Sequence, residues 1–253
     1  MGDLVSIITP AYNSARFIAD TIESVISQTY QDWEMIIVDD CSDDETVSIA
    51  RKYGDDRIRC ISHHSRMGAA AARNTALKAA RGRWIAFLDS DDLWETDKLE
   101  RQIRFMMDND YAFSYTAYRE TDVNGKPTGR IVKGPKHIGK WGMYAYCWPG
   151  CLTVMYDTHK VGLVQTANLD ITDDYAIWLK VVRKAECHLL DAVLARHRGV
   201  PGSLSDRGYA YKVRCHYRLF RHTEGRSFPV AMLFTGGNLL FGTLKKLLYV
   251  KKE

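Results

Sequence analysis

The sequence predicts an α/β fold with a mostly parallel central sheet flanked by helices. In the first hundred residues, short apolar runs typical of buried strands alternate with longer segments whose apolar residues recur at helical spacing. Strands separated by helices of this length pair in parallel through right-handed crossovers, with helices on both faces of the sheet. Ligands of such sheets bind beyond the carboxyl ends of the strands, so the residues that follow each strand form the candidate site.

The strands and helices of this first part are expected to alternate regularly. The strands are expected at residues 4–9, 33–40, 58–62 and 83–89. The helices are expected at residues 15–29, 42–53 and 68–82. Asn13 and Ser14 are candidate caps of the first helix and Asp43 of the second, because short polar side chains accept the free N–H groups of a first turn.

The character of the sequence changes after Trp94. A helix is expected at residues 97–109, strands at 111–122 and 150–157, and a helix at 173–185. Asn124 and Gly125 form a turn signal after the first of these strands. Residues 127–147 are rich in glycine, lysine and aromatic side chains without clear periodicity, so we expect a segment dominated by loops.

Composition and charge argue against a nucleic-acid-binding protein. The 253 residues include 35 basic and 31 acidic side chains, a formal charge of +4 that is too balanced for a nucleic-acid footprint. The six cysteines form no CxxC pair, and the first residues lack the basic and apolar regions of a signal peptide. We therefore expect no nucleic-acid partner, and reduced thiols in a cytoplasmic protein.

Three carboxylates follow the fourth expected strand, in the stretch "WIAFLDSDDLW". Ionised groups without a partner are costly at the end of a buried strand, so Asp89, Asp91 and Asp92 need a partner there. Mg²⁺ commonly takes one or two carboxylates and completes its shell with water and phosphate oxygens. The cluster therefore predicts a divalent-cation site that a diphosphate-bearing ligand completes.

Four segments in a fixed order resemble glycosyltransferase family 2, whose members have the GT-A fold. They are "VSIITPAYN", "SVISQTYQDWEMIIVDDCSDD", "GAAAARNTALKAARGRWIAFLDSDD" and "DDYAIWLK". The resemblance spans roughly residues 4–205 and is strongest to enzymes of bacterial surface polysaccharides such as teichuronic acid, O-antigen or capsule. It implies a Rossmann-like nucleotide-binding half at 1–95, an acceptor-side half at 96–222 and a helical, basic tail at 223–253.

The resemblance also implies an activity and a donor site. The activity is an inverting, metal-dependent transfer of a hexosyl or N-acetylhexosaminyl group from a nucleotide sugar, foremost a UDP-sugar, to a lipid-linked saccharide acceptor. The residues expected to bind the donor nucleotide are Pro10, Tyr12, Asp40, Arg73 and Asp89. Tyr12 would flank the base, and Asp40 would accept the N–H of a uracil-type base. Arg73 would pair with a donor phosphate or carboxylate.

The acidic cluster receives separate roles from the same resemblance. Asp91 would be the direct ligand of Mn²⁺ or Mg²⁺, and Asp89 would approach the ribose or the water shell of the metal. Asp92 either supports the metal site or caps the next helix. The cation would act as a Lewis acid that stabilises the charge growing on the leaving nucleotide.

An inverting transfer needs a carboxylate that takes the proton of the acceptor hydroxyl. In "ITDDYAIWLK", Asp174 matches the position of this base, with Asp173 beside it and Trp178 one helical turn further on. The alternative is that both aspartates only cap the helix. Asp173 and Trp178 are candidates for acceptor contacts.

The segment "RHRGVPGSLS" resembles the flexible loop that closes over the donor in this family. Arg198 and the serines at Ser203 and Ser205 match the pattern, but Val200 stands where a histidine is common. Any donor contact of that histidine is therefore in doubt, with His197 as the alternative.

The C-terminal tail combines an uncharged stretch, residues 227–244, with four lysines after it, Lys245, Lys246, Lys251 and Lys252. Its glycines, proline and asparagine make it a poor transmembrane span. We expect an interfacial segment whose lysines face anionic lipid, which would hold the protein on the cytoplasmic face of the inner membrane. The alternative is a helix packed on the domain or on a second subunit, so a homo-oligomer stays open.

Other functions are weaker hypotheses. A nucleotidyltransferase would need a glycine- and arginine-rich phosphate loop after the first strand, where this chain has Pro10–Asn13. A non-catalytic sugar-nucleotide-binding subunit would not need Asp174, and a phosphoaspartate receiver would not explain the second acidic cluster. The transferred sugar, a UDP or dTDP donor, the acceptor and the linkage are left open by the sequence.

Overall fold

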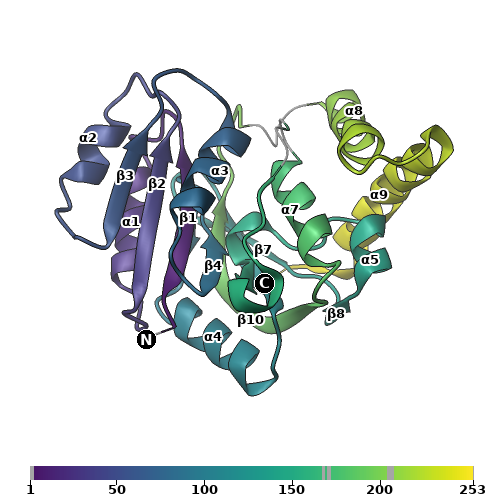
Figure 1. Ribbon diagram of the computed structural model, residues 1–253, viewed down its shortest axis with the longest axis horizontal. Helices are drawn as coiled ribbons and strands as arrows, with labels where there is room; N and C mark the ends of the chain where they lie inside the picture. Colours follow the sequence, from purple (N-terminus) through teal and green to yellow (C-terminus); the bar gives the residue numbers. More distant parts are fainter. Residues whose placement is uncertain (1–2, 167–168, 170–171, 204–207, 253) are drawn as a thin grey trace.

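The computed structural model describes residues 3–166, 169, 172–203 and 208–252. Its centre is a mixed, mostly parallel sheet with helices on both faces, as the sequence predicts (Figure 1). The strands of the first half are β1 (Val5–Ala11), β2 (Trp33–Asp39), β3 (Ile58–Ser62), β4 (Trp84–Phe87) and β5 (Leu93–Trp94). Those of the second half are β6 (Phe113–Thr121), β7 (Pro127–Val132), β8 (His137–Ile138), β9 (Met155–Asp157), β10 (Cys187–Arg198) and β11 (Val250–Lys252).

The helices follow the expected order in the first half and add elements in the second. They are α1 (Ile18–Ile26), α2 (Thr46–Arg51), α3 (Ala69–Ala79), α4 (Lys98–Asp108) and α5 (Lys140–Ala145). Further along lie the 3₁₀ helix η1 (Cys151–Thr153), α6 (Thr158–Val161), α7 (Asp173–Val181), α8 (Tyr209–Arg218), the π-helical turn η3 (Leu219–Thr223) and α9 (Phe228–Leu248).

The main sheet has the strand order β11-β7-β6-β9-β4-β1-β2-β3. The pairs β3–β2, β2–β1 and β1–β4 are parallel, whereas β9 pairs antiparallel with β4 and β6. Ala11 at the end of β1 lies opposite Asp39 at the end of β2, and the Asp40 N–H donates to the Ala11 carbonyl at 2.8 Å. The residues after these strands therefore leave the sheet at the same edge.

The central strands are buried on both faces. Along β1, Ile7 and Ile8 are both inaccessible to solvent and belong to different apolar clusters, because successive strand residues point to opposite faces. Helices α3 and α7 pack over one face, and α1 and α4 pack over the other. Burial on both sides explains why these strands are apolar without alternation.

The predicted helix caps are wrong. The structure gives α1 no side-chain cap, and the hydroxyl of Ser14 contacts a different loop. Asp44 rather than Asp43 accepts the N–H of Thr46, the first residue of α2, at 2.9 Å. Asn13 accepts the N–H of Asp43 at 3.1 Å instead of capping α1. These polar residues tie together the two loops that follow β1 and β2.

Two expectations for the second half are also wrong. Residues 127–147 contain β7, β8 and α5 rather than mainly loop. Nothing in the sequence indicated β7, because this strand is mostly exposed and has no apolar pattern. The strand expected at 150–157 is shorter, since η1 occupies its first part and β9 only Met155–Asp157.

The C-terminal segment folds back onto the domain. α9 packs against α5, α8 and η3, and β11 adds to the sheet beside β7. Lys245 is buried, and its Nζ donates to the Trp148 carbonyl at 2.7 Å, so the expectation that this lysine faces lipid is wrong. Lys246, Lys251 and Lys252 are exposed. Among the described residues, no helix is both long and apolar enough to cross a membrane.

Candidate active site

A cavity of about 990 Å³ lies beyond the carboxyl ends of β1, β2 and β4, in the crevice that the topology predicts. Its volume is at the upper end of the range of ligand pockets. Its walls come from the loops after these strands, the start of α3, the start of α7, the end of β10 and α8. The site residues predicted from the sequence that line it are Pro10, Tyr12, Asp40, Arg73, Asp89, Asp91, Asp173, Asp174, Arg198 and Ser203.

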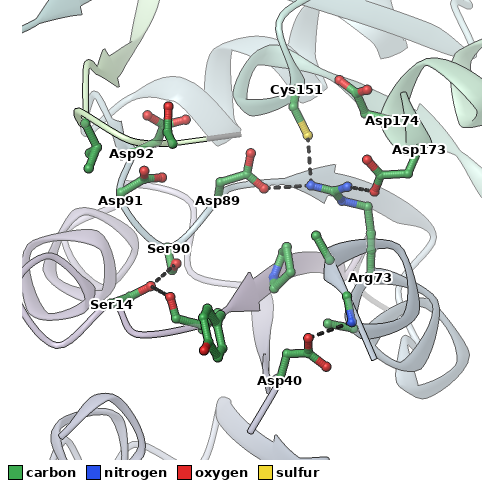
Figure 2. Close-up of a pocket in the computed structure, with 18 of the residues that line it drawn as sticks. Ser14, Asp40, Arg73, Asp89, Ser90, Asp91, Asp92, Cys151, Asp173 and Asp174 are labelled. Carbon is green, nitrogen blue, oxygen red and sulfur yellow. Dashed lines mark hydrogen bonds and ion pairs between the residues drawn. The ribbon is translucent and has the colours of Figure 1, made fainter. Parts of the chain in front are cut away.

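Hydroxyl groups fasten the acidic loop to the loop after β1. The Oγ atoms of Ser14 and Ser90 lie 2.7 Å apart, a contact drawn in Figure 2. From α1, the Thr21 hydroxyl lies 3.0 Å from the Ser90 carbonyl and 2.9 Å from the Asp92 carbonyl. Because Thr21 is fully buried, the backbone of the acidic loop is held against the helix. The loop therefore has a defined position relative to β1.

Arg73 on α3 links the two acidic parts of the cavity. Its Nη2 donates to Asp89 Oδ1 at 2.8 Å, and its Nη1 donates to Asp173 Oδ2. Figure 2 shows the guanidinium between these carboxylates, with the Cys151 thiol 3.7 Å from Nη2. Arg73 is only 4 % exposed. The predicted contact of Arg73 with a donor phosphate stays a prediction. The structure shows instead that the guanidinium pairs with two carboxylates of the protein.

The acidic loop has the ligand chemistry that a hard divalent cation requires. Burial and then the charge of Asp89 raise the pKa of Asp91 to about 6. Burial raises the pKa of Asp92 well above its ordinary value, and Asp92 Oδ1 accepts the backbone N–H of Arg198 at 2.9 Å. Carboxylate oxygens are the ligand type that Mn²⁺ and Mg²⁺ prefer. The direct metal contact of Asp91 stays a prediction.

Asp174 is the second residue of α7 and follows Asp173, the partner of Arg73. Burial and then the charge of Asp173 raise the pKa of Asp174 to about 7. Asp174 Oδ1 accepts the N–H of Tyr175 at 2.6 Å, and the carboxyl group lines the cavity. A carboxylate whose pKa lies near neutral pH is suited to take a proton from an acceptor hydroxyl. Asp173, in contrast, is bound to Arg73 and orients it.

Asp40 supports the loop that leads into α3. Its Oδ1 accepts the N–H of Met67 at 2.9 Å and contacts His63 Nδ1 at 2.8 Å, while Oδ2 accepts the N–H of Gly68 at 2.7 Å. Gly68 has a φ of +92°, a conformation that residues with a side chain rarely adopt. The predicted bond of Asp40 to a base would have to use the lone pairs that these contacts leave.

Tyr12 lies at the mouth of the cavity and is 38 % exposed. The guanidinium of Arg66 lies over its ring, 4.0 Å from the centroid. Pro10 lies in β1 opposite Val38 and contributes to the cavity floor. A planar base therefore has a tyrosine and an arginine at the edge of the cavity, which suits the predicted flanking role.

Arg198 ends β10 beside the acidic loop. Its Nη2 donates to Asp20 Oδ2 at 2.9 Å, and its guanidinium lies 4.9 Å from the Phe17 ring centroid. Ser203 follows the turn and donates its N–H to the Val200 carbonyl at 3.2 Å. His197 also lines the cavity. The predicted lid function of this segment remains a prediction, and Ser205 lies outside the described residues.

Trp178 does not line the cavity, so the expectation of a direct acceptor or lid contact is wrong. Its side chain has no exposed surface and packs edge-on against Phe87, with ring centroids 4.9 Å apart. The ring of Phe113 also packs against Trp178, with centroids 5.9 Å apart. Spacing along a helix cannot distinguish the inward face from the cavity face, and here the ring anchors α7 in the core.

Several cavity residues were missed by the sequence reasoning. They are Arg66, Cys151, Ser90 and three side chains of α8, Tyr211, Lys212 and His216. Arg66 could have been found from its position just before the start of α3. Cys151 and α8 gave no signal, because they are brought to the cavity from distant parts of the chain.

A second group of metal-ligating side chains lies away from this cavity, at the β8–β10 pair. His137, Glu186 and His188 present ligand atoms within 4.8 Å of one another. His137 Nε2 lies 2.6 Å from Glu186 Oε2, and the Tyr111 ring stacks on His188 at 3.6 Å. These contacts account for the cluster without an ion.

Comparison with known proteins decides the family. The model of glycosyl transferase family 2 matches residues 6–153. TuaG of Bacillus subtilis, assigned to teichuronic acid biosynthesis, is 42% identical over 205 residues, which are 80% of this chain and 81% of TuaG. The chain belongs to glycosyltransferase family 2. Two relatives from Escherichia coli, WfaP and WfgD, are UDP-Glc:α-D-GlcNAc-diphosphoundecaprenol β-1,3-glucosyltransferases.

These family members match over most of their length. WfaP is 41% identical over 78% of this glycosyltransferase and 79% of its own chain. WfgD is 41% identical over 71% of this glycosyltransferase and 70% of its own chain. The resemblance to this family, inferred from four segments of the sequence, is thereby confirmed.

Solved structures agree on the fold. TarS 1-349 of S. aureus, in complex with UDP-GlcNAc, superposes with a TM-score of 0.68 at 22% identity, over 85% of this glycosyltransferase and 66% of that chain. The mannosyltransferase PcManGT from Pyrobaculum calidifontis, in complex with GDP-Man and Mn²⁺, superposes with a TM-score of 0.65 at 21% identity. The match covers 92% of this glycosyltransferase and 68% of that chain. The predicted GT-A fold is confirmed.

Proposed function

We propose that this glycosyltransferase moves a hexosyl group from a UDP-sugar, foremost UDP-glucose, to a lipid-linked saccharide with inversion at the anomeric carbon. The observation that carries the proposal is the joining of two carboxylate groups around one cavity by Arg73. The acidic loop suits a donor diphosphate with its cation, and Asp174 suits deprotonation of an acceptor. The two Escherichia coli relatives support UDP-glucose and a diphosphoundecaprenol-linked acceptor.

The residues of the chain would divide the reaction between them. Asp174 would accept the proton of the acceptor hydroxyl while the oxygen attacks the anomeric carbon. The bond from that carbon to the diphosphate oxygen breaks at the same time, and the nucleoside diphosphate leaves on the opposite side. Attack from the opposite face inverts the configuration. Arg73 would keep Asp173 and Asp89 fixed on either side of the reacting atoms.

The donor side would be completed by a divalent cation. Asp91 would hold Mn²⁺ or Mg²⁺ directly, and Asp89 would approach the ribose or the water shell of the cation. When bound, the cation would neutralise the charge that grows on the leaving diphosphate. Tyr12 and Arg66 would flank the base, and Asp40 would accept its N–H.

The experiment is a transfer assay with UDP-glucose, UDP-galactose, UDP-GlcNAc and dTDP-glucose against a GlcNAc-diphosphate acceptor on a short alkyl chain. Mass spectrometry detects the product, and NMR of the new glycosidic bond reads its anomeric configuration. We expect a β-linked product from UDP-glucose and none with Asp174→Asn. An α-linked product from the α-linked donor would overturn inversion. Donor binding without any product would instead support the non-catalytic binding subunit.

A further inference from the structure

The face of α9 that packs on the domain is mixed, because three polar side chains are buried there beside the apolar contacts of Ala231, Phe234 and Phe241. Thr235, Asn238 and Lys245 are all buried there. Asn238 Nδ2 donates to the Tyr144 carbonyl at 3.3 Å, and Lys245 Nζ donates to the Trp148 carbonyl at 2.7 Å. These bonds fix the rotation of the helix, because turning it would leave a buried amide and a buried ammonium without acceptors.

The outward face of α9 is apolar. Leu233, Leu240 and Leu247 recur every seven residues and are 71 %, 61 % and 74 % exposed. This stripe is offset by two residues from Asn238 and Lys245, a rotation of about 200°, so it points away from the domain. Other exposed apolar side chains on α9 are Phe228, Met232 and Leu248. The outward face of α9 thus exposes large apolar side chains where a surface helix usually presents polar ones, and such a surface marks an interaction site.

The same end of the molecule is strongly basic. Residues 208–252 contain nine lysine and arginine side chains and a single acidic one, Glu224. The side chain of Glu224 pairs with Arg183 and is almost inaccessible to solvent. The rest of the chain has more acidic than basic residues, because the whole has 35 basic and 31 acidic side chains. An apolar stripe within a basic region complements an anionic lipid surface better than a neutral protein partner.

This end also borders the cavity. Helix α8 packs against α9, and the two lie together at one end of the molecule (Figure 1). Tyr211, Lys212 and His216 of α8 line the cavity. A surface that holds α9 therefore also holds the α8 wall of the cavity close to it.

We propose that the outward face of α9 lies on an anionic bilayer, and that a lipid-linked acceptor enters the cavity from the bilayer past α8. The acceptor route rests on the proposed function, whereas the bilayer contact is independent of it. The contact area is the apolar stripe of Leu233, Leu240 and Leu247, and the lysines after α9 add attraction to lipid phosphates.

The test of the bilayer contact needs no enzymatic activity. The full chain is sedimented with vesicles of phosphatidylglycerol and phosphatidylethanolamine, and with vesicles of phosphatidylcholine alone. We expect binding to the anionic vesicles that weakens in high salt. Leu233→Glu combined with Leu240→Glu should lower the vesicle partition coefficient at least tenfold. Met107→Glu, a change of an exposed apolar residue on α4, is the matched control and should bind like the wild type.

Three results would overturn the bilayer contact. One is equal vesicle binding by the wild type and the double variant. Another is no binding by the wild type at all. The third is a wild-type dimer that becomes a monomer in the double variant while vesicle binding is unchanged, as measured by analytical ultracentrifugation, since the face would then bind a second copy. Circular dichroism checks that the double variant is folded.

The acceptor route is tested separately with two forms of one acceptor. The double variant should retain wild-type turnover of the acceptor on a short, soluble alkyl chain. With the same saccharide on a long polyprenyl chain in vesicles, its turnover should fall at least tenfold. Equal loss on both acceptors would overturn the route. Vesicle binding without turnover of either acceptor by the wild type would count against the proposed function only.

Discussion

Arg73 Nη2 donates to Asp89 Oδ1 at 2.8 Å, and this ion pair joins the helix α3 to the acidic loop of the cavity. The other terminal nitrogen of Arg73 is bonded to Asp173, the neighbour of the proposed base. One buried side chain therefore links the acidic loop to the start of α7. Its energetic and catalytic consequences are measurable.

Replacing Arg73 by lysine should impair both stability and catalysis. Lysine keeps the charge but has no planar fork that can bond two carboxylates at once. Breaking a buried pair in this way is expected to lower the free energy of unfolding by about 2–4 kcal/mol. Misplacement of the flanking carboxylates should reduce kcat/KM about 100-fold. Urea unfolding and the transfer assay measure the two effects.

The control for Arg73 is Arg104→Lys on α4. Arg104 pairs with Glu100 one turn away, at 3.0 Å and largely exposed, so its replacement should leave both quantities unchanged within error. A wild-type kcat/KM in Arg73→Lys would contradict the linking role.

Activity should rise with pH through about 7. Asp174 must be ionised to act as a base, and burial with the charge of Asp173 raises its pKa to about 7. The measurement is kcat/KM from pH 5.5 to 8.5, where we expect loss on the acidic side with a half-maximal value near pH 7. A rate that stays flat down to pH 5.5 would exclude Asp174 as the base.

The same carboxyl group should cost stability at high pH. Because its pKa is raised in the folded protein, the folded state binds the proton more tightly than the unfolded state, and stability falls as pH rises from about 4 to 7. Asp174→Asn should therefore be inactive yet about 1–2 kcal/mol more stable than the wild type at pH 8. This gain should vanish at pH 4, and an equal gain at both pH values would show another cause.

Cation-dependent donor binding should depend on Asp91. Calorimetric titration of UDP, GDP and dTDP with and without Mn²⁺ should give UDP binding that chelation abolishes and Mn²⁺ restores. Asp91→Asn should weaken Mn²⁺-dependent binding at least 100-fold, whereas Asp108→Asn, an exposed change on α4, should not. Since the pKa of Asp91 is raised to about 6, protons should compete with the cation below that pH. UDP binding that is unchanged by chelation of the metal and by Asp91→Asn would refute the metal-ligand role of Asp91.

Trp178 should matter for stability rather than for acceptor affinity. Its ring is fully buried against Phe87, so Trp178→Ala should lower the free energy of unfolding by about 3–5 kcal/mol. Trp178→Phe should lose less and keep the acceptor KM within threefold. A large increase in the acceptor KM at unchanged stability would restore the acceptor contact expected from the sequence.

Much of the first half could be predicted from the sequence because its signals are local. The strands β1 to β4 are short apolar runs, α3 is an alanine-rich segment, and the acidic loop follows directly after β4. The cavity at their carboxyl ends then follows from the parallel crossover rule. The family resemblance supplied the individual roles, and ten of its eleven site residues line one cavity.

The sequence by itself determined the α/β order, the crevice and the chemistry of its carboxylates, because each depends on neighbours along the chain. Only the tertiary structure decided that the guanidinium of Arg73 pairs with Asp89 and Asp173, and that Trp178 faces the core. It also decided that α9 turns Lys245 inward and Leu233, Leu240 and Leu247 outward. The physical reason is that a helix pattern shows which residues share a face, whereas the side on which the domain packs depends on contacts between segments far apart in the chain.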